Sequence, residues 1–147
     1  GQRLPTEPEW QLAASWRIVS DTDVLYRFPW GDAMDRKKCN IWASQVCSTV
    51  PVDSYEHGAA PNSVVQLIGN VWEWVESDLD IVTEEGVQIL GEMTMKSARG
   101  GAFDTYFESQ CTALFRSGFN ALTRAHNLGF RCALSLTDAH WLGKGTE

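Results

Sequence analysis

The stretch from residue 17 to residue 63 most constrains the fold of this chain, because its hydrophobic residues follow neither a helical nor a strand period. Prolines and glycines interrupt it repeatedly, at Pro29, Gly31, Pro51, Gly58 and Pro61. So long a segment without regular structure is uncommon inside a compact domain. At 147 residues the chain fits one domain, and seven Trp, six Phe and three Tyr supply large side chains for its core. The sequence therefore predicts one domain with no regular element across this stretch.

One short amphipathic helix is expected at residues 7–15. Thr6 and Glu9 have the spacing of a capping box, in which the threonine hydroxyl accepts from the Glu9 amide and the glutamate reaches back. Pro8 falls in the first turn, where a missing N–H group costs little. The residues that share the apolar face of this helix are Trp10, Ala13 and Ala14.

Several short strands are expected further along the chain. Val71–Val75 alternates in part, and residues 82–97 alternate well enough for short strands or a hairpin. Ala98–Phe103 and Gly129–Ser135 are predicted to be paired core strands. Leu136–Glu147 is interpreted as a tail. No internal repeat or linker divides the chain.

The charge of the chain excludes some functions. Its net charge of −7 repels phosphate backbones, and its basic run, Arg36–Lys38, follows Asp32 and Asp35. We therefore expect no nucleic-acid binding. The sequence has no apolar run of 18 residues, so no transmembrane segment is expected. No signal peptide is visible, and any leader or lipid anchor would lie upstream of the first residue.

Four short segments occur in one order along the chain and carry a family resemblance. They are Arg3–Trp10, Gly69–Trp74, Arg99–Phe103 and Asn127–Arg131, with Phe28–Gly31 and Thr49–Val52 between them. Over residues 1–136 the chain resembles the C-terminal half of a formylglycine-generating enzyme (sulfatase-modifying factor) domain, and residues 137–147 form a tail. The resemblance implies an α+β, loop-rich, C-type-lectin-like fold with short mixed sheets and few short helices.

The resemblance also implies where catalytic groups would lie. Active members of the family are copper-dependent oxidases that convert a cysteine of a sulfatase to formylglycine. Two cysteine thiolates bind their Cu(I), as suits a soft ion. Counted from the Arg-Gly-Gly segment, those two places hold Thr105 and Gln110 here, and the place of the active-site serine holds Ala102. Copper is therefore not expected. A one-residue gap could align Cys111 with the second place, but Thr105 would still leave a single thiolate.

Calcium is the second ion that the resemblance implies. The matching ligands are the side-chain amide of Gln66 and the backbone carbonyls of Leu67, Gly69 and Val71. Gln66 is one methylene longer than the usual asparagine, which an irregular calcium cage can tolerate. A second, weaker site would begin at the pair Asn40 and Ile41. The loop that follows this pair lacks the aspartate that the family would provide.

The four cysteines suit two disulfides by their even number. The expected pairs are Cys39 with Cys47 and Cys111 with Cys132; a metal site and free thiols remain the alternatives. The second pair has support from the resemblance, which implies that the segments carrying these two cysteines are neighbours. Two disulfides would indicate a periplasmic, secreted or cell-surface location.

Three hypotheses for function follow. The first is a non-catalytic binding or structural subunit, a pseudoenzyme that contacts a protein, or a glycan, through the loops Arg36–Val46 and Asp104–Gln110. Tyr106 and Phe107 would be its anchors, unless they pack in the core. The second is the copper-dependent oxidase. In the third, the partner is the N-terminal half of the family domain. Glu73, between two tryptophans, is expected to pair with a nearby arginine: Arg99, Arg116 or Arg131.

Overall fold

The computed structural model describes residues 1–19, 22–79, 81–82, 88–89, 95–135 and 138. Its helices are α1 (Glu7–Ser15) and three short 3-10 turns: η1 (Trp42–Ser44), η2 (Glu56–Gly58) and η3 (Glu108–Gln110). Its strands are β1 (Trp16–Val19), β2 (Thr22–Leu25), β3 (Trp72–Asp78), β4 (Ile81–Val82), β5 (Gln88–Ile89), β6 (Met95–Arg99), β7 (Arg116–Asn120) and β8 (Leu128–Phe130). No helix in these ranges is both long and apolar enough to cross a membrane.

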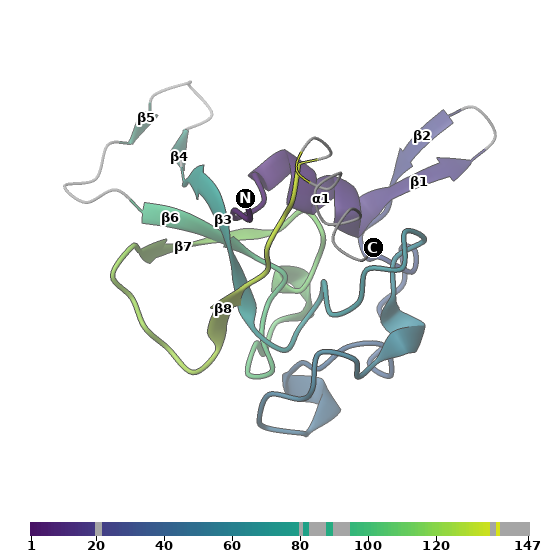
Figure 1. The fold of residues 1–147 in the computed structure, drawn as a ribbon. Helices are drawn as coiled ribbons and strands as arrows, with labels where there is room; N and C mark the ends of the chain where they lie inside the picture. The colour runs from purple at the N-terminus through teal and green to yellow at the C-terminus, as the bar shows by residue number, and fades with distance from the viewer. Residues whose placement is uncertain (20–21, 80, 83–87, 90–94, 136–137, 139–147) are drawn as a thin grey trace, which may run out of the picture.

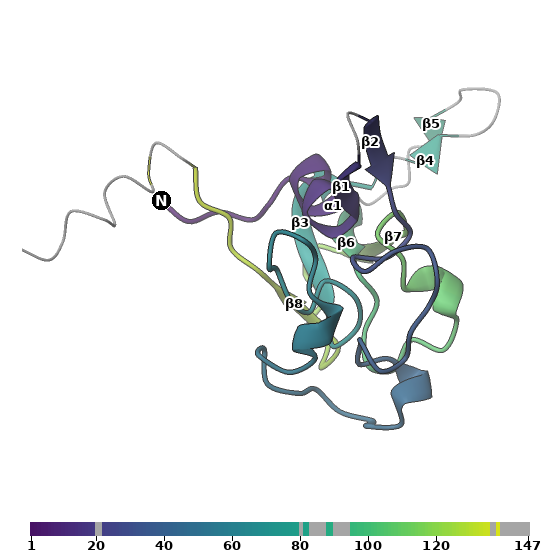
Figure 2. The same ribbon diagram turned by 90° about the vertical axis from the view of Figure 1, so that its right-hand side faces the viewer.

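A mixed four-stranded sheet forms the centre of the fold, in the order β7-β6-β3-β8 (Figure 1). Strand β3 pairs antiparallel with β6 and parallel with β8, and β6 pairs antiparallel with β7. Strands β1 and β2 form a hairpin directly after α1. Figures 1 and 2 both place the loops that carry η1 and η2 at the opposite end of the molecule from this hairpin. The α+β, loop-rich fold is as expected. The absence of regular elements expected across residues 17–63 is wrong at its start, where β1 and β2 pair.

The predicted helix is confirmed as α1. The Glu9 amide donates to Thr6 Oγ1 at 3.4 Å and the Thr6 amide donates to Glu9 Oε2 at 2.8 Å, which completes the capping box. Trp10 and Ala14 are both 1% exposed, so the predicted apolar face points into the core. Ala13 packs against the same core at its edge. This local signal was therefore sufficient to define the helix.

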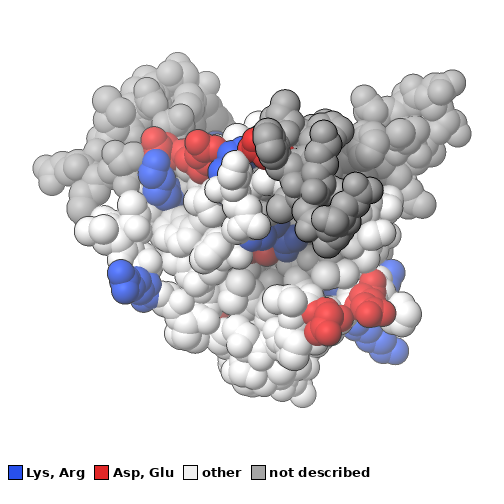
Figure 3. Space-filling view, viewed as in Figure 1, with Lys and Arg blue, Asp and Glu red and all other residues white. Residues whose placement is uncertain are grey.

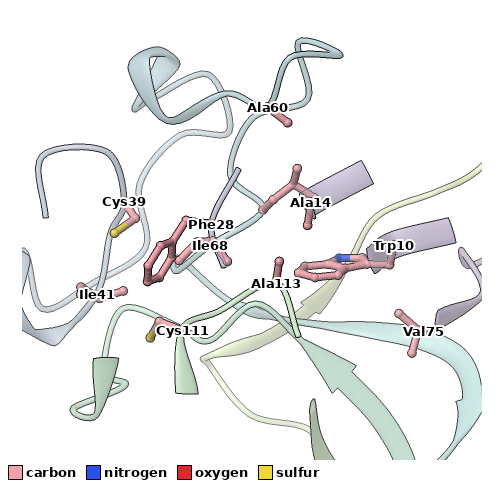
Figure 4. Packing of buried hydrophobic residues seen from close by; sticks show 11 residues of the cluster. Trp10, Ala14, Phe28, Cys39, Ile41, Ala60, Ile68, Val75, Cys111 and Ala113 are labelled. Atoms are coloured by element: carbon pink, nitrogen blue, oxygen red, sulfur yellow. The ribbon is translucent and has the colours of Figure 1, made fainter. Parts of the chain in front are cut away.

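The main hydrophobic core explains how the stretch without sequence period becomes ordered. Its buried members come from α1, from the loops and from β3: Trp10, Ala14, Phe28, Cys39, Ile41, Ala60, Leu67, Ile68, Val75, Cys111 and Ala113 (Figure 4). Phe28 also stacks on Trp30, with 5.5 Å between ring centroids. Because most of these residues lie outside helices and strands, contacts distant in sequence hold the loops in place.

Two strand predictions are corrected by the structure. Ala98–Phe103 does not continue as a strand, because Gly100 and Gly101 have φ angles of 93° and 77° and turn the chain away after β6. Gly129–Ser135 does not pair with it either: the strand here is β8, and β3 lies between β6 and β8.

Other strand predictions are confirmed or lie outside the described residues. Val71–Val75 falls in β3, which starts one residue later and is longer than predicted. Within residues 82–97, β4 and β5 pair as a short hairpin. Residues 83–87 and 90–94 lie outside the described ranges, as does the tail apart from Asp138.

Candidate functional site

The segment after β6 forms a tight turn at the family's catalytic position. The Ala102 amide donates to Thr105 Oγ1 at 2.8 Å, and the Thr105 amide donates to the Ala102 carbonyl at 3.0 Å. Ala102 is fully buried and Thr105 is 7% exposed. The Thr105 hydroxyl therefore holds the turn. Gln110 ends η3, where its amide donates to the Phe107 carbonyl at 3.0 Å.

The turn holds no sulfur donor at the three positions expected from the resemblance. Within the described ranges there is also no group of three or more His, Cys, Asp and Glu side chains that could hold a metal ion. Ala102, Thr105 and Gln110 therefore offer no thiolate at the places that the resemblance implies.

Three exposed aromatic side chains form a patch beside this turn, which we call the aromatic patch: Trp42, Tyr106 and Phe107. They are 50%, 67% and 62% exposed, respectively. Tyr106 contacts both other rings, with centroids 6.3 Å from Trp42 and 5.3 Å from Phe107. The core-packing alternative for Tyr106 and Phe107 is therefore wrong. Sequence analysis had included Trp42 in a contact loop without singling it out as an anchor.

Backbone and side-chain contacts join the two loops that carry the aromatic patch. The Trp42 amide donates to the Thr105 carbonyl at 3.4 Å. Arg36 Nε donates to Glu108 Oε1 at 2.8 Å, and this ion pair is more than one third exposed on both sides. An exposed pair of this kind contributes little stability. The hydrogen bond between the Trp42 amide and the Thr105 carbonyl therefore restricts the relative position of the rings more than the ion pair does.

Glu73 lies at the junction of α1, β3 and β8. It is 6% exposed, and its two carboxylate oxygens accept from Arg131 Nε and Nη2, both at 2.6 Å. Trp10 Nε1 donates to the same carboxylate at 2.6 Å. The expectation that Glu73 pairs with an arginine is confirmed, and the arginine is Arg131. A bidentate pair of this type is strong and directional.

Arg99 makes a second buried network, on the side of the helix. It is 1% exposed and donates to Glu7 Oε1 at 2.6 Å, to Gln11 Oε1 at 3.0 Å and to the Ala113 carbonyl at 2.9 Å. Burial lowers the pKa of the Arg99 guanidinium, and Glu7 opposes that shift. Arg99 thus anchors α1 to the end of β6.

The residues expected to bind calcium are partly suited to a hard cation. Gln66 donates through Nε2 to the Ser54 carbonyl at 2.8 Å, whereas its buried Oε1 has no hydrogen-bond partner. Gln66 and Val71 line a cavity of about 270 Å³ that also includes Glu73. Leu67 and Gly69 are not among its lining residues. Arg131 also lines the cavity and occupies both oxygens of Glu73, so the donor that remains for a cation is the free amide oxygen of Gln66.

The weaker pair, Asn40 and Ile41, fits a cation less well. Asn40 Oδ1 is buried without a partner, as Gln66 Oε1 is. The Ile41 carbonyl, however, accepts from the Ser44 amide at 2.9 Å. With no carboxylate supplied by residues 45–48, this pair lacks the charge that calcium sites usually contain.

The two disulfides expected from the sequence are not formed in the structure. All four cysteines are free; Cys39 and Cys111 are buried, and Cys47 and Cys132 are exposed. Each expected pair thus joins a buried thiol to an exposed one. Burial raises the pKa of Cys39 to about 12, and the proximity of Cys111 adds to the shift. Cys39 therefore lies near Cys111, a residue distant in sequence.

The charged side chains are interspersed rather than segregated on the face shown in Figure 3, where blue and red residues lie side by side. Among the described residues, Arg36 pairs with Glu108 and Lys96 pairs with Asp78. The described residues on this face therefore form no continuous basic stripe.

Comparison with known proteins identifies the family. Residues 1–136 match the Sulfatase-modifying factor enzyme 1-like domain, and the chain belongs to that family. An inactive C-alpha-formylglycine-generating enzyme 2 from Bos taurus is 28% identical over 142 residues, covering 90% of this chain and 44% of the relative. A formylglycine-generating enzyme from Streptomyces coelicolor is 31% identical over 157 residues, covering 90% of this chain and 46% of the relative.

Solved structures agree with the fold. The crystal structure of CarF aligns with a TM-score of 0.68 and 25% identity, covering 90% of this chain and 47% of CarF. The chain thus spans less than half the length of these relatives. The relatives include proteins named as enzymes and proteins named as inactive, so the family by itself does not decide between catalysis and binding.

Proposed function

We propose that this chain is a non-catalytic binding module that docks a protein partner through the aromatic patch. The observation that supports the proposal is the patch itself. Its three aromatic side chains are each at least 50% exposed, Tyr106 contacts both other rings, and a backbone hydrogen bond joins the two loops. Exposed aromatic residues in a cluster are typical of interface anchors. The loss of sulfur donors at Thr105 and Gln110 supports the non-catalytic half of the proposal.

The ring geometry favours a protein partner over a glycan. Trp42 and Tyr106 are inclined by 56°, and Tyr106 and Phe107 by 89°. Rings set at such angles offer edges and faces that suit pockets on a protein surface. They do not form the shared flat platform on which successive sugar rings would stack.

The test places a photo-crosslinking amino acid at Tyr106 of the full-length protein in its natural host. The matched control carries the same group at Leu122, which is 88% exposed and lies outside the aromatic patch. We expect one discrete protein adduct at position 106 and none at 122. The adduct partner, identified and purified, should bind the wild type and lose at least tenfold affinity for Trp42→Ser/Phe107→Ser. Equal affinity for that variant would refute the proposal that the aromatic patch binds the partner. Binding to a glycan array that is lost in the same variant would show that the partner is a glycan and not a protein.

The oxidase alternative is kept because a relative with 31% identity is named formylglycine-generating enzyme. It predicts that the protein loaded with Cu(I) converts the target cysteine of a sulfatase-derived peptide to an aldehyde in the presence of oxygen. We expect no aldehyde, because Thr105 and Gln110 provide no thiolates. If the loaded protein formed the aldehyde faster than free Cu(I) does without protein, the chain would be an oxidase and the non-catalytic proposal would be wrong.

We further propose that calcium binds in the cavity beside Gln66. Gln66 Oε1 would hold the ion, together with backbone carbonyls such as that of Val71, while Glu73 stays paired with Arg131. A buried acceptor without a partner costs about 1–3 kcal/mol, and a cation would remove that cost. Calcium here would have a structural role, because the cavity lies between loops that contribute to the core.

A further inference from the structure

The loops 36–42 and 105–111 run beside each other, and each carries one cysteine. The Arg36–Glu108 ion pair, at 2.7 Å, lies three residues before Cys39 and three residues before Cys111. The Trp42 amide, after Cys39, donates to the carbonyl of Thr105, which also precedes Cys111. Cys39 therefore lies between the two contacts, and Cys111 follows both of them.

Both cysteines belong to the same core cluster, and the Cys39 thiol donates to the Asp35 carbonyl at 3.8 Å. Cys39 and Cys111 are each 0% exposed and belong to one buried cluster with Phe28 and Ile41 (Figure 4). Cys111 also packs tightly against Gly101: a Cβ atom on that glycine would lie 2.8 Å from Cys111 Sγ. Burial raises the pKa of both thiols to about 12, and for Cys39 the charge on Cys111 adds to the shift. The two cysteines are thus buried in one hydrophobic cluster on neighbouring loops.

We propose that Cys39 and Cys111 form an intramolecular disulfide when the protein folds in an oxidising environment. Both S–H bonds break and one Sγ–Sγ bond forms. The two electrons and two protons reduce a small-molecule disulfide, such as oxidised glutathione, to two thiols. Cys47 and Cys132, which are exposed, stay as thiols.

The bond would form during folding rather than after it. In the folded protein the raised pKa keeps both thiols protonated, and a protonated thiol is a poor nucleophile. Burial also keeps soluble reductants and oxidants away from the sulfurs. Once formed, the bond would tie together the two loops that carry the aromatic patch. The inference does not depend on the partner of that patch.

Peptide mapping tests the pairing directly. The chain is unfolded and reduced, refolded in a buffer of reduced and oxidised glutathione, alkylated under denaturing conditions, and digested with trypsin and chymotrypsin. Cleavage after Lys38 and Trp42 separates Cys39 from Cys47, and cleavage after Arg116 and Arg131 separates Cys111 from Cys132. We expect a peptide of Cys39 joined to a peptide of Cys111, with the other two cysteines alkylated. A link to Cys47 or Cys132, or four alkylated thiols, would overturn the inference.

A thermal measurement separates the bond from the packing of the side chains. Each protein is refolded once in the glutathione buffer and once, from the reduced and unfolded chain, in dithiothreitol, and the difference between the two melting temperatures is the readout. The wild type and the control Cys47→Ser/Cys132→Ser should both lose several degrees on reduction. Cys39→Ala and Cys111→Ala should show no difference, whatever their packing defect. A difference that persists in Cys39→Ala would show that the stabilising bond lies elsewhere.

Discussion

Gly101 is restricted both by its backbone conformation and by a neighbouring side chain. Its φ of +77° disfavours any side chain, and an added Cβ would lie 2.8 Å from Cys111 Sγ. Gly31 has the same kind of positive φ, +134°, with open space around it. The two glycines therefore allow the backbone effect and the contact effect to be measured separately.

We predict that Gly31→Ala lowers the free energy of unfolding by about 1–3 kcal/mol through backbone strain alone. Gly101→Ala should lose about 1–3 kcal/mol more, because the new methyl group overpacks the core against Cys111. Urea denaturation of both variants measures the difference. Equal losses would mean that the core accommodates the methyl group and that Cys111 is not fixed against Gly101.

Glu9 gives a pH-dependent prediction at the same scale. Its hydrogen bonds with Arg3, and then with the Thr6 amide, lower the pKa of the carboxyl from its ordinary 4.5 to about 2. As the pH falls, the unfolded chain takes up this proton first. The stabilisation is therefore complete above about pH 4.5 and is lost as the pH falls to about 2.

The measurement compares the wild type with Glu9→Gln by urea denaturation across this range. The stability difference should be largest above pH 4.5 and should shrink toward zero near pH 2. Glu56→Gln, a change at an exposed carboxylate in η2, is the control and should show no such trend. A constant difference for Glu9→Gln would contradict the role of the ionised carboxylate.

At the level of elements, the Glu73 carboxylate is one of the groups that connect the helix to the sheet. Glu73 on β3 accepts from Trp10 on α1 and from Arg131, which directly follows β8. Three elements therefore depend on one side chain that is 6% exposed. The exposed Arg36–Glu108 pair offers a contrast, since it also joins distant segments but lies in solvent.

We predict that Glu73→Gln lowers the free energy of unfolding by about 3 kcal/mol, because it leaves the Arg131 guanidinium without its counter-charge. Glu108→Gln, the matched change at the surface pair, should cost less than about 1 kcal/mol. Chemical denaturation of the two variants gives the comparison. Similar small losses would mean that water reaches Glu73 and screens its pair.

At the scale of the whole molecule, the calcium proposal predicts a change in stability. Adding calcium to protein treated with a chelator should raise the melting temperature, because the ion binds the folded state. Gln66→Leu should abolish the increase, since it removes Oε1 while keeping the size of the side chain. Asn62→Leu is the control, because Asn62 is exposed, lies outside this cavity and should keep the increase. If calcium raised the melting temperature of Gln66→Leu as much as that of the wild type, Gln66 would not be a calcium ligand.

The sequence predicted those parts of the fold that depend on neighbouring residues. Thr6 and Glu9 are three residues apart, so the cap of α1 could be recognised locally, and the motif around Trp72 correctly indicated a strand. Pairing across the chain could not be predicted in the same way. No local rule places β8 beside β3 rather than beside β6, or Cys39 near Cys111.

In the candidate site, too, features set by neighbouring residues were predicted and features set by distant contacts were not. The turn residues Ala102 and Thr105 followed from the motif that precedes them, and the exposure of Tyr106 and Phe107 was one of two alternatives. Trp42 was not recognised as an anchor because its role depends on a ring contact with a residue that is far away in sequence. Glu73 was expected to pair with an arginine, but its place beside Gln66 required the three-dimensional arrangement of β3 and the preceding loop.

The contact of Trp10, Glu73 and Arg131 has a consequence for biosynthesis. During translation, Trp10 emerges before its acceptor Glu73, and that acceptor has no cation until residue 131 leaves the ribosome. This buried contact can therefore form only after residue 131 has been synthesised.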